Sequence, residues 1–256
     1  RQMCIRDSYN LNNDIYLEYK AYSSDSALHY LNENMLLARQ LKDKERELKI
    51  QLELSYLLSS IGMYMEAADI LNSIDRQTLP SSLLGHYYTC YEHVYFEAGA
   101  AQPRYKMFAS RYAKLSHAYR DSMQVTLDPS SATYLWLRET QLREAGKYDE
   151  ALEFSDRRLA ESSFGTPQYA LVAYQRFRLF ESMGKKDEHL YYLVLSAISD
   201  VRSAIKEQSS LMVLAQELNS KGDLKRAYDY INFSWEISQF YKTRLRSWMN
   251  TVSYTH

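Results

Sequence analysis

The chain has 256 residues, with 31 Lys and Arg against 32 Asp and Glu, so its formal net charge is −1. This balance does not favour direct nucleic-acid binding, which usually requires a basic face, and no internal stretch reaches the roughly 18 apolar residues of a membrane span. Hydrophobic residues make up 46% of the chain, enough for a sizeable core, and the scarcity of Gly (seven) and Pro (four) favours long helices with short connections.

The two ends of the chain read as translations of one oligonucleotide on opposite strands. MCIRD near the start can be written ATG TGT ATA AGA GAC, and the reverse complement of these codons encodes the final VSYTH. We therefore expect residues 1–8 and 251–256 to be sequencing-adapter artefacts, with one native repeat domain over residues 9–250. Cys4 would belong to the artefact, which leaves Cys90 as the native cysteine, expected to be a small buried hydrophobe.

About six antiparallel helix pairs are predicted within the native segment. The first pair ends in the helix SDSALHYLNENMLLARQL, where Asp25 or Ser24 is the expected N-cap. The second and third pairs are expected over residues 47–74 and about 82–126. Helix starts are predicted at four later points of the chain: Pro103, Pro129, Thr166-Pro167 and Ser209. The last pair is expected to continue beyond Trp248, and no strand pattern or internal domain boundary is visible, so the predicted fold is all-α.

Four glycines share one sequence context, and three of them are evenly spaced: 184 − 146 = 38 and 222 − 184 = 38. A fixed period of this size indicates stacked repeats. Each glycine is expected to end a helix in the left-handed conformation. The four are Gly62, Gly146, Gly184 and Gly222.

Two further positions recur after these glycines. An apolar plug between helices is expected two residues later, at Tyr64, Tyr148 and Leu224, although Lys186 breaks the rule. A small residue that permits close helix approach is expected five residues later, at Ala67, Ala151 and Ala227. His189 occupies this second position in the copy at Gly184, which predicts locally different packing.

The motif Gly-x-Tyr-x-x-Ala in residues 62–67 and 146–151 resembles the tetratricopeptide repeat. This resemblance covers most of residues 9–250 and implies a solenoid of helical hairpins, with several units longer than the usual 34 residues. Neither helix of a hairpin can bury its apolar stripe alone, so neighbouring hairpins must stack.

Four longer phrases are similar to the repeat region of a Bacteroidota family that carries a domain of unknown function, DUF6377. They are SDSALHYLNEN, RDSMQVTLDPSSATYLWLRE, YYLVLSAISDVRSAIKEQSSL and INFSWEISQFYKTRLR. The resemblance implies a periplasmic sensor half of a membrane-anchored regulatory protein, with the membrane span just beyond Asn250. A cytoplasmic adaptor or assembly scaffold of the same fold is the alternative.

Sequence motifs for catalysis or cofactor binding are not found. His86 and His93 are seven residues apart and could share a helix face, but zinc-binding pairs on helices usually sit at i, i+4. There is no nucleophile elbow and no phosphate-binding glycine loop. Carboxylate pairs such as Asp149/Glu150 and Asp187/Glu188 complement helix dipoles at helix starts. We expect a non-catalytic protein without metal or cofactor.

Binding is therefore expected on a groove. In the repeat class that this chain resembles, first helices usually line the concave surface, and a peptide or protein partner is expected there. The candidate contacts are Trp136, Arg143, Tyr174, Arg178, Gln216 and Asn219. Arg side chains can fork onto a carboxylate, such as a peptide terminus, but an ordinary solvated face remains the alternative for all six.

Two other patterns leave alternatives open, and a third has a single expected role. The stripes Tyr87, Tyr88, Tyr91, Tyr95 and Tyr169, Phe177, Phe180 are expected to fill the core, with groove lining as the alternative. The segment SAISDVRSAIKEQSS, with Asp200, Arg202 and Lys206, is either a solvated face or part of a repeat junction. SSFGT, around Gly165, is expected to be a turn between repeats.

Overall fold

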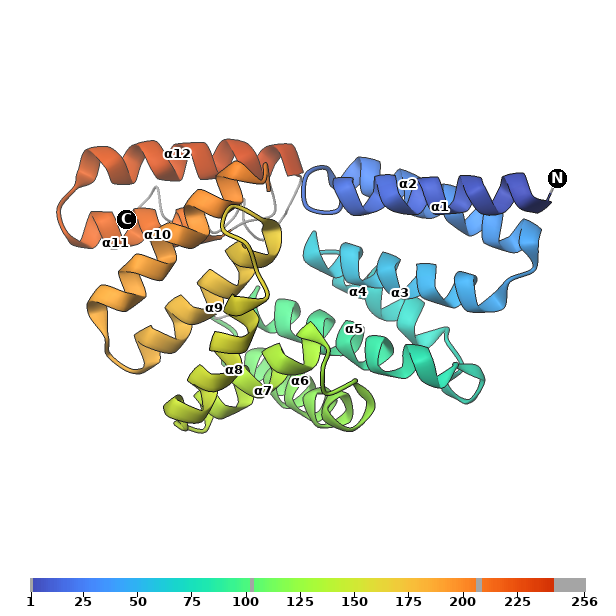
Figure 1. The fold of residues 1–256 in the computed structure, drawn as a ribbon, viewed down its shortest axis with the longest axis horizontal. Coiled ribbons are helices and arrows are strands. Elements are labelled where there is room, and N and C mark those ends of the chain that lie inside the picture. Colours follow the sequence, from blue (N-terminus) through green and yellow to red (C-terminus); the bar gives the residue numbers. More distant parts are fainter. Residues whose placement is uncertain (1, 102–103, 206–208, 242–256) are drawn as a thin grey trace. The chain divides into compact units, whose positions relative to one another are not determined.

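A computed structural model describes residues 2–101, 104–205 and 209–241, and within these ranges every regular element is a helix (Figure 1). The prediction of an all-α fold with about six helix pairs is confirmed. The α-helices are α1 (Gln2–Tyr19), α2 (Ser24–Leu41), α3 (Lys44–Ser60), α4 (Tyr64–Asn72), α5 (Ser81–Ala100), α6 (Lys106–Thr126), α7 (Ala132–Glu144), α8 (Tyr148–Ala160), α9 (Pro167–Ser182), α10 (Lys186–Arg202), α11 (Ser210–Ser220) and α12 (Leu224–Tyr241), with a short 3₁₀ turn at Arg76–Thr78.

The chain divides into two compact units. The first holds α1–α6 and the second holds the elements between Asp128 and Phe240. In the first unit, α3 packs against α2, α4 and α5, so the second hairpin contacts both the first and the third. In the second unit, α8 and α9 make contact, as do α10 and α11. Among the described residues, no helix combines the length and the apolar character needed to cross a membrane.

Side-chain caps fix several helix starts. Thr166 caps α9 by accepting the Tyr169 backbone N–H at 3.2 Å, and Pro167 is the first helical residue, as predicted. The predicted cap of α2 is wrong by at least one residue: extended Ser23, not Ser24 or Asp25, accepts from the Ser26 N–H at 3.4 Å.

The fourth pair also starts later than predicted. Pro129 precedes α7 by three residues, because Asp128 organises a turn by accepting the Ser130 N–H at 2.8 Å and Ser131 then caps the helix. The predicted start at Pro103, the predicted end beyond Trp248 and the neighbour role of Lys206 lie outside the described residues.

The repeated glycines adopt the conformation that the sequence predicts. Gly62, Gly146, Gly184 and Gly222 have φ values of 90°, 74°, 71° and 80°. In every copy the residue after the glycine donates its backbone N–H to the carbonyl five residues earlier, at 2.9 to 3.0 Å. The glycine N–H bonds to the carbonyl three residues earlier, at 3.0 to 3.1 Å. These paired bonds define the Schellman motif, which reverses the chain while satisfying the last carbonyls of the first helix.

Close packing of the second helix depends on the residue five positions after each glycine. Ala67 and Ala151 are fully buried and Ala227 is 7% exposed, so this prediction is confirmed. His189 takes the equivalent place in α10, where its ring packs against Phe177 with centroids 5.0 Å apart. The expected plug at Leu224 is wrong, because this side chain is 66% exposed at the first turn of α12.

Aromatic side chains form much of the core, as predicted. Tyr87, Tyr88 and Tyr91 of α5 are buried, and the Tyr91 ring stacks on Tyr119 of α6 with centroids 4.6 Å apart. In the second unit, Phe177 joins buried leucines of α10 and α11 in one cluster. Groove lining is therefore not needed to explain these stripes.

Two buried ion pairs join the first and second helices of a hairpin. Glu92 of α5 accepts from the Arg120 Nε at 2.8 Å and from the Ser116 Oγ at 2.9 Å. Glu139 of α7 accepts from Arg158 of α8. Both pairs have side chains at most 5% exposed, so each carboxylate depends on its partner for compensation.

The segment around Arg202 belongs to a repeat junction. Ser203 donates its hydroxyl to the Gly165 carbonyl at 2.8 Å, and the Arg202 guanidinium lies 5.2 Å from the Phe164 ring centroid. Asp200 is buried and accepts from the Ser210 hydroxyl. The turn that precedes α9 is thereby attached to the end of α10, which supports the junction alternative over a solvated face.

Candidate functional site

The candidate site of the first unit lies on α1, α3 and α5, the first helices of three successive pairs. Contacts between these helices recur at one sequence separation: Tyr16 and Glu53 are 37 residues apart, and so are Tyr56 and His93 (93 − 56 = 37). Equivalent positions of consecutive first helices therefore lie next to one another. A register of this kind turns one position of the repeat into a row of side chains across several helices.

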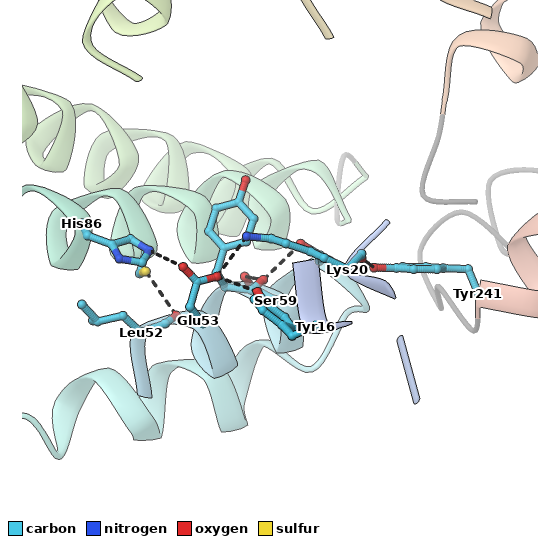
Figure 2. Close-up of polar contacts among 10 residues, drawn as sticks. Tyr16, Lys20, Leu52, Glu53, Ser59, His86 and Tyr241 are labelled. Atoms are coloured by element: carbon cyan, nitrogen blue, oxygen red, sulfur yellow. Dashed lines mark hydrogen bonds and ion pairs between the residues drawn. The ribbon is translucent and has the colours of Figure 1, made fainter. Parts of the chain in front are cut away.

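Glu53 is the centre of this row (Figure 2). Its Oε2 accepts from the Tyr16 hydroxyl at 2.5 Å and from the Lys20 Nζ at 3.0 Å, while Oε1 lies 3.7 Å from the His86 Nε2. Tyr16 is buried, whereas the side chains of Lys20, Glu53 and His86 are 34%, 18% and 29% exposed. The carboxylate is thus held from α1 and α5 on a face that a ligand can reach.

Aromatic groups continue the row. The Lys20 Nζ lies 5.0 Å from the Tyr56 ring centroid, and the other neighbour of Tyr56 is the His93 ring, stacked with centroids 3.9 Å apart. His93 is positioned by a 2.7 Å contact between its Nδ1 and the Ser59 Oγ, and its Nε2 is 3.9 Å from Glu97. An ammonium, a phenol ring and an imidazole are therefore packed in sequence across three helices.

Electrostatics fix the charge state of the cluster. Burial alone would raise the pKa of Glu53, but the charges of Lys20 and His86 and the Tyr16 hydrogen bond outweigh it and lower that pKa. Burial lowers the pKa of His86, and the positive charges of Lys20 and Lys49 lower it further against the pull of Glu53. The surroundings therefore favour the ionised form of the Glu53 carboxyl and the uncharged form of the His86 imidazole.

This arrangement can recognise polar and aromatic groups. The half-exposed side chains offer an ammonium donor, carboxylate oxygens, an imidazole and a flat ring within one row, which suits hydrogen bonding and stacking with a ligand. Within the described residues, no cluster of three or more His, Cys, Asp or Glu side chains is placed to hold a metal ion. Cys90 is fully buried, as predicted, and burial raises the pKa of its thiol, which donates to the Leu52 carbonyl at 3.4 Å.

The six residues predicted from the sequence lie on the first helices of the second unit. Arg178, Gln216 and Asn219 are exposed, and the Arg178 Nε is 3.4 Å from Glu181. Tyr174 is half-buried and packs against the apolar cluster around Phe177. Trp136 and Arg143 are half-buried on α7. Their placement on first helices matches the expectation, and their contact with a ligand stays a prediction.

The sequence does not predict the Glu53 row, because the six candidate groove contacts all fall in the last three pairs. The prediction that His86 and His93 could share a helix face is confirmed, since both side chains contact α3. The sequence feature that indicates this cluster is the register between first helices: an offset of 37 residues places Tyr16 beside Glu53 and Tyr56 beside His93. Pairing equivalent positions of consecutive first helices would have revealed the cluster.

Comparison with known families completes the description. The model of a family described as the SusR N-terminal TPR domain, where TPR denotes the tetratricopeptide repeat, matches residues 3–251. A comparison with curated proteins finds no match. The tetratricopeptide resemblance is thus confirmed, whereas the DUF6377 likeness and the adapter origin of the two ends stay predictions. With nearly its whole length matched, the chain belongs to the SusR N-terminal TPR domain family.

Proposed function

We infer that this chain is a repeat scaffold for protein–protein interactions, which tetratricopeptide-repeat domains generally mediate. Stacked hairpins bury their apolar faces against one another and leave extended surfaces made by equivalent helices. The family description supports a repeat region of the regulator type.

We propose that this region is a non-catalytic sensor that binds a peptide or protein on its first helices, as the periplasmic half of a membrane-anchored regulatory protein. The observation that carries the binding proposal is the Glu53 row, where charged and aromatic side chains of α1, α3 and α5 are held together yet remain accessible. First helices of the second unit also carry exposed polar side chains that are available to a ligand, namely those of Arg178, Gln216 and Asn219.

Binding can be tested by screening a displayed peptide library with the 256-residue chain. We expect captured peptides to lose affinity when Lys20→Gln or Arg178→Gln removes a cation from a first helix. Arg39→Gln is the matched control, because Arg39 is exposed on the second helix α2. Peptides that respond equally to all three substitutions, or to none of them, would show that the first helices are not the contact surface.

The periplasmic placement rests on the DUF6377 likeness and needs its own test. We expect alkaline phosphatase, which is active only after export, to be active when fused after Asn250 of a gene that encodes this region. An inactive enzyme with a fluorescent cytoplasmic fusion at the same point would favour the adaptor alternative instead.

A further inference from the structure

The start of α6 concentrates positive charge. Residues 98–120 form the longest stretch of the chain without an acidic residue, and they contain five Lys and Arg side chains. One of these, Arg120, is buried in an ion pair. Lys106, Arg111 and Lys114 are exposed, and no ion pair within the described part of the chain engages them. The first turns of α6 are thus cationic in a chain whose formal net charge is −1.

The backbone of α6 adds to this positive field. A helix N-terminus carries a partial positive charge, and α8 and α10 each place two carboxylates in their first turn. The first turn of α6 has no acidic residue and begins with Lys106. An anionic surface therefore meets the cations and the helix end together, without a carboxylate to repel it.

Exposed apolar side chains lie among these cations. Tyr105, Met107 and Phe108 are 65%, 74% and 40% exposed. Arg111 and Lys114 follow Met107 by four and seven residues, so these three side chains share the solvent-facing side of α6. Bulky apolar groups mixed with Lys and Arg are typical of helices that bind at a membrane interface.

The two helices of this hairpin pack closely just behind the exposed side chains. Gly99 permits the approach of α5 to α6, because a Cβ built on it would lie 3.4 Å from the Tyr112 Cβ. The Tyr112 ring in turn stacks on Tyr95 of α5 with centroids 6.1 Å apart. The apolar groups at the start of α6 are therefore presented by a packed hairpin, which lowers the ordering cost of binding.

The composition of this surface favours lipid over other anionic partners. Duplex nucleic acid is held through many phosphate contacts, and three exposed cations supply few. An acidic protein surface would engage the cations without using Met107 or Phe108. A phospholipid surface uses both kinds of group, because its phosphates bind Lys and Arg while apolar side chains enter the boundary between headgroups and acyl chains.

We propose that the start of α6 binds the surface of an anionic phospholipid membrane. The α6 patch that makes this contact consists of Tyr105, Lys106, Met107, Phe108, Arg111 and Lys114. Its cations bind headgroup phosphates, and its apolar side chains enter the interface. This contact goes beyond the sensor function proposed above. It requires neither a peptide ligand nor a membrane span, so it stands or falls separately from both.

Co-sedimentation of the 256-residue chain with lipid vesicles tests the contact. We expect binding to vesicles that mix phosphatidylglycerol with phosphatidylcholine, and little binding to phosphatidylcholine alone. The triple variant Lys106→Gln, Arg111→Gln, Lys114→Gln should bind the mixed vesicles about hundredfold less tightly, since each cation near an anionic surface contributes about fivefold. Equal binding to the two kinds of vesicle, or binding to neither, would overturn the proposal.

A second triple variant is the matched control. Lys186→Gln, Lys221→Gln, Lys225→Gln removes three exposed lysines from the second unit and gives the chain the same net charge as the first variant. It should bind nearly as well as the parent chain. An equal loss of affinity in both variants would show an effect of net charge alone and would overturn the assignment to the α6 patch.

Insertion of the apolar groups can be measured at Met107. Met107→Cys in a Cys4→Ser background takes an environment-sensitive fluorophore at one site, because Cys90 is buried. Its emission should shift to the blue when mixed vesicles are added, whereas the same fluorophore at Lys225→Cys should not respond. Unchanged emission from vesicle-bound protein labelled at Met107→Cys would contradict insertion.

Competition distinguishes lipid from other anionic partners. Duplex DNA and polyglutamate carry negative charge without an apolar interior, so neither should displace the chain from mixed vesicles at matched charge concentration. Displacement by DNA would overturn the lipid assignment and identify a nucleic-acid surface. Displacement by polyglutamate alone would overturn it in favour of an acidic protein partner.

Discussion

Gly184 shows how one backbone conformation limits the sequence. Its φ is +71°, and a Cβ built on it would meet no atom within 4 Å. The penalty of Gly184→Ala is therefore purely conformational, and we expect the free energy of unfolding to fall by about 1–2 kcal/mol. Urea denaturation followed by circular dichroism measures this change.

Ser182→Ala, two residues earlier, is the control for this substitution. Ser182 is exposed at the end of α9, so its replacement should change stability by less than about 0.5 kcal/mol. A Gly184→Ala protein as stable as the control would show that the turn does not require the left-handed conformation.

The pH dependence of stability follows from two lowered pKa values. Burial and nearby lysines lower the pKa of His86 below its ordinary 6.5, so the unfolded chain takes up this proton first as the pH falls. Stability is therefore lost as the pH falls below about 6.5. Glu53, with its pKa lowered below 4.5 by Lys20 and His86 against the opposing effect of burial, adds a second loss in the same direction at more acid pH.

His86→Gln isolates the first of these losses. We expect the variant to lose less stability than the parent chain between pH 7.5 and pH 5.5, measured as the free energy of unfolding in urea at each pH. Identical losses in the two proteins would contradict the assignment of this proton uptake to His86.

At the residue scale, the sequence predicts positions that obey a local backbone rule and misses those set by neighbours. Gly184 and the Thr166–Pro167 start follow from conformational preference alone. Residue type does not predict the α2 cap, because Ser23, Ser24 and Asp25 are all good capping residues, and only the extended backbone at Ser23 decides among them.

The contact between α7 and α8 depends on the buried pair Glu139 and Arg158. Burial raises the pKa of Glu139, although Arg158 opposes this, which indicates a carboxylate that needs its partner to stay charged. Arg158→Met should therefore cost about 3 kcal/mol or more, because it leaves a buried charge uncompensated. The double replacement Glu139→Leu, Arg158→Met should cost much less, and thermal unfolding of the four proteins in the cycle measures the difference.

An Arg158→Met protein no less stable than the double variant would refute this account of the pair. The exposed pair of Lys147 and Glu150 at the start of α8 provides the matched control. Breaking it with Lys147→Met should change stability by less than about 1 kcal/mol, since both side chains are in contact with water.

At the scale of the secondary-structure elements, the positions of the helices can be predicted from the sequence. The side-chain contacts that join one helix to the next cannot. Apolar periodicity and glycine punctuation fix where helices begin and end to within a few residues. The partners Glu139 and Arg158 are 19 residues apart on different helices, and many acidic and basic residues share such separations. Only the packing of α7 on α8 selects this pair.

At the scale of the whole molecule, the stacking of hairpins predicts that a destabilising substitution loosens mainly the hairpin that contains it. Each hairpin contacts its neighbours, so stability is approximately a sum of hairpin and interface contributions. We expect Arg158→Met to speed amide hydrogen exchange in α7 and α8 while leaving α1–α3, whose core includes Ala27 and Leu31, unchanged. Hydrogen-exchange mass spectrometry measures both regions in one experiment, and equal acceleration in both would show global rather than local coupling.

The repeat period can be read from the spacing of Gly146, Gly184 and Gly222, because the left-handed turn between the two helices of a hairpin favours glycine. The Glu53 row was not predicted, because it depends on which residues of α1, α3 and α5 become neighbours after stacking. Ligand contacts are less constrained still, since an exposed side chain such as Gln216 satisfies the fold whether or not it meets a partner.

His189 makes one hairpin of the array non-interchangeable. Where Ala67 and Ala151 let two helices close directly, an imidazole in α10 fills the space against Phe177 and comes within 3.8 Å of Glu217 in α11. A chimera that duplicates the fourth hairpin in place of the fifth would put Ala at this position. The chimera would also remove Phe177 of α9, and Glu217 would lose its imidazole neighbour. Engineered lengthening or shuffling of this scaffold therefore has to move His189, Phe177 and Glu217 as one set.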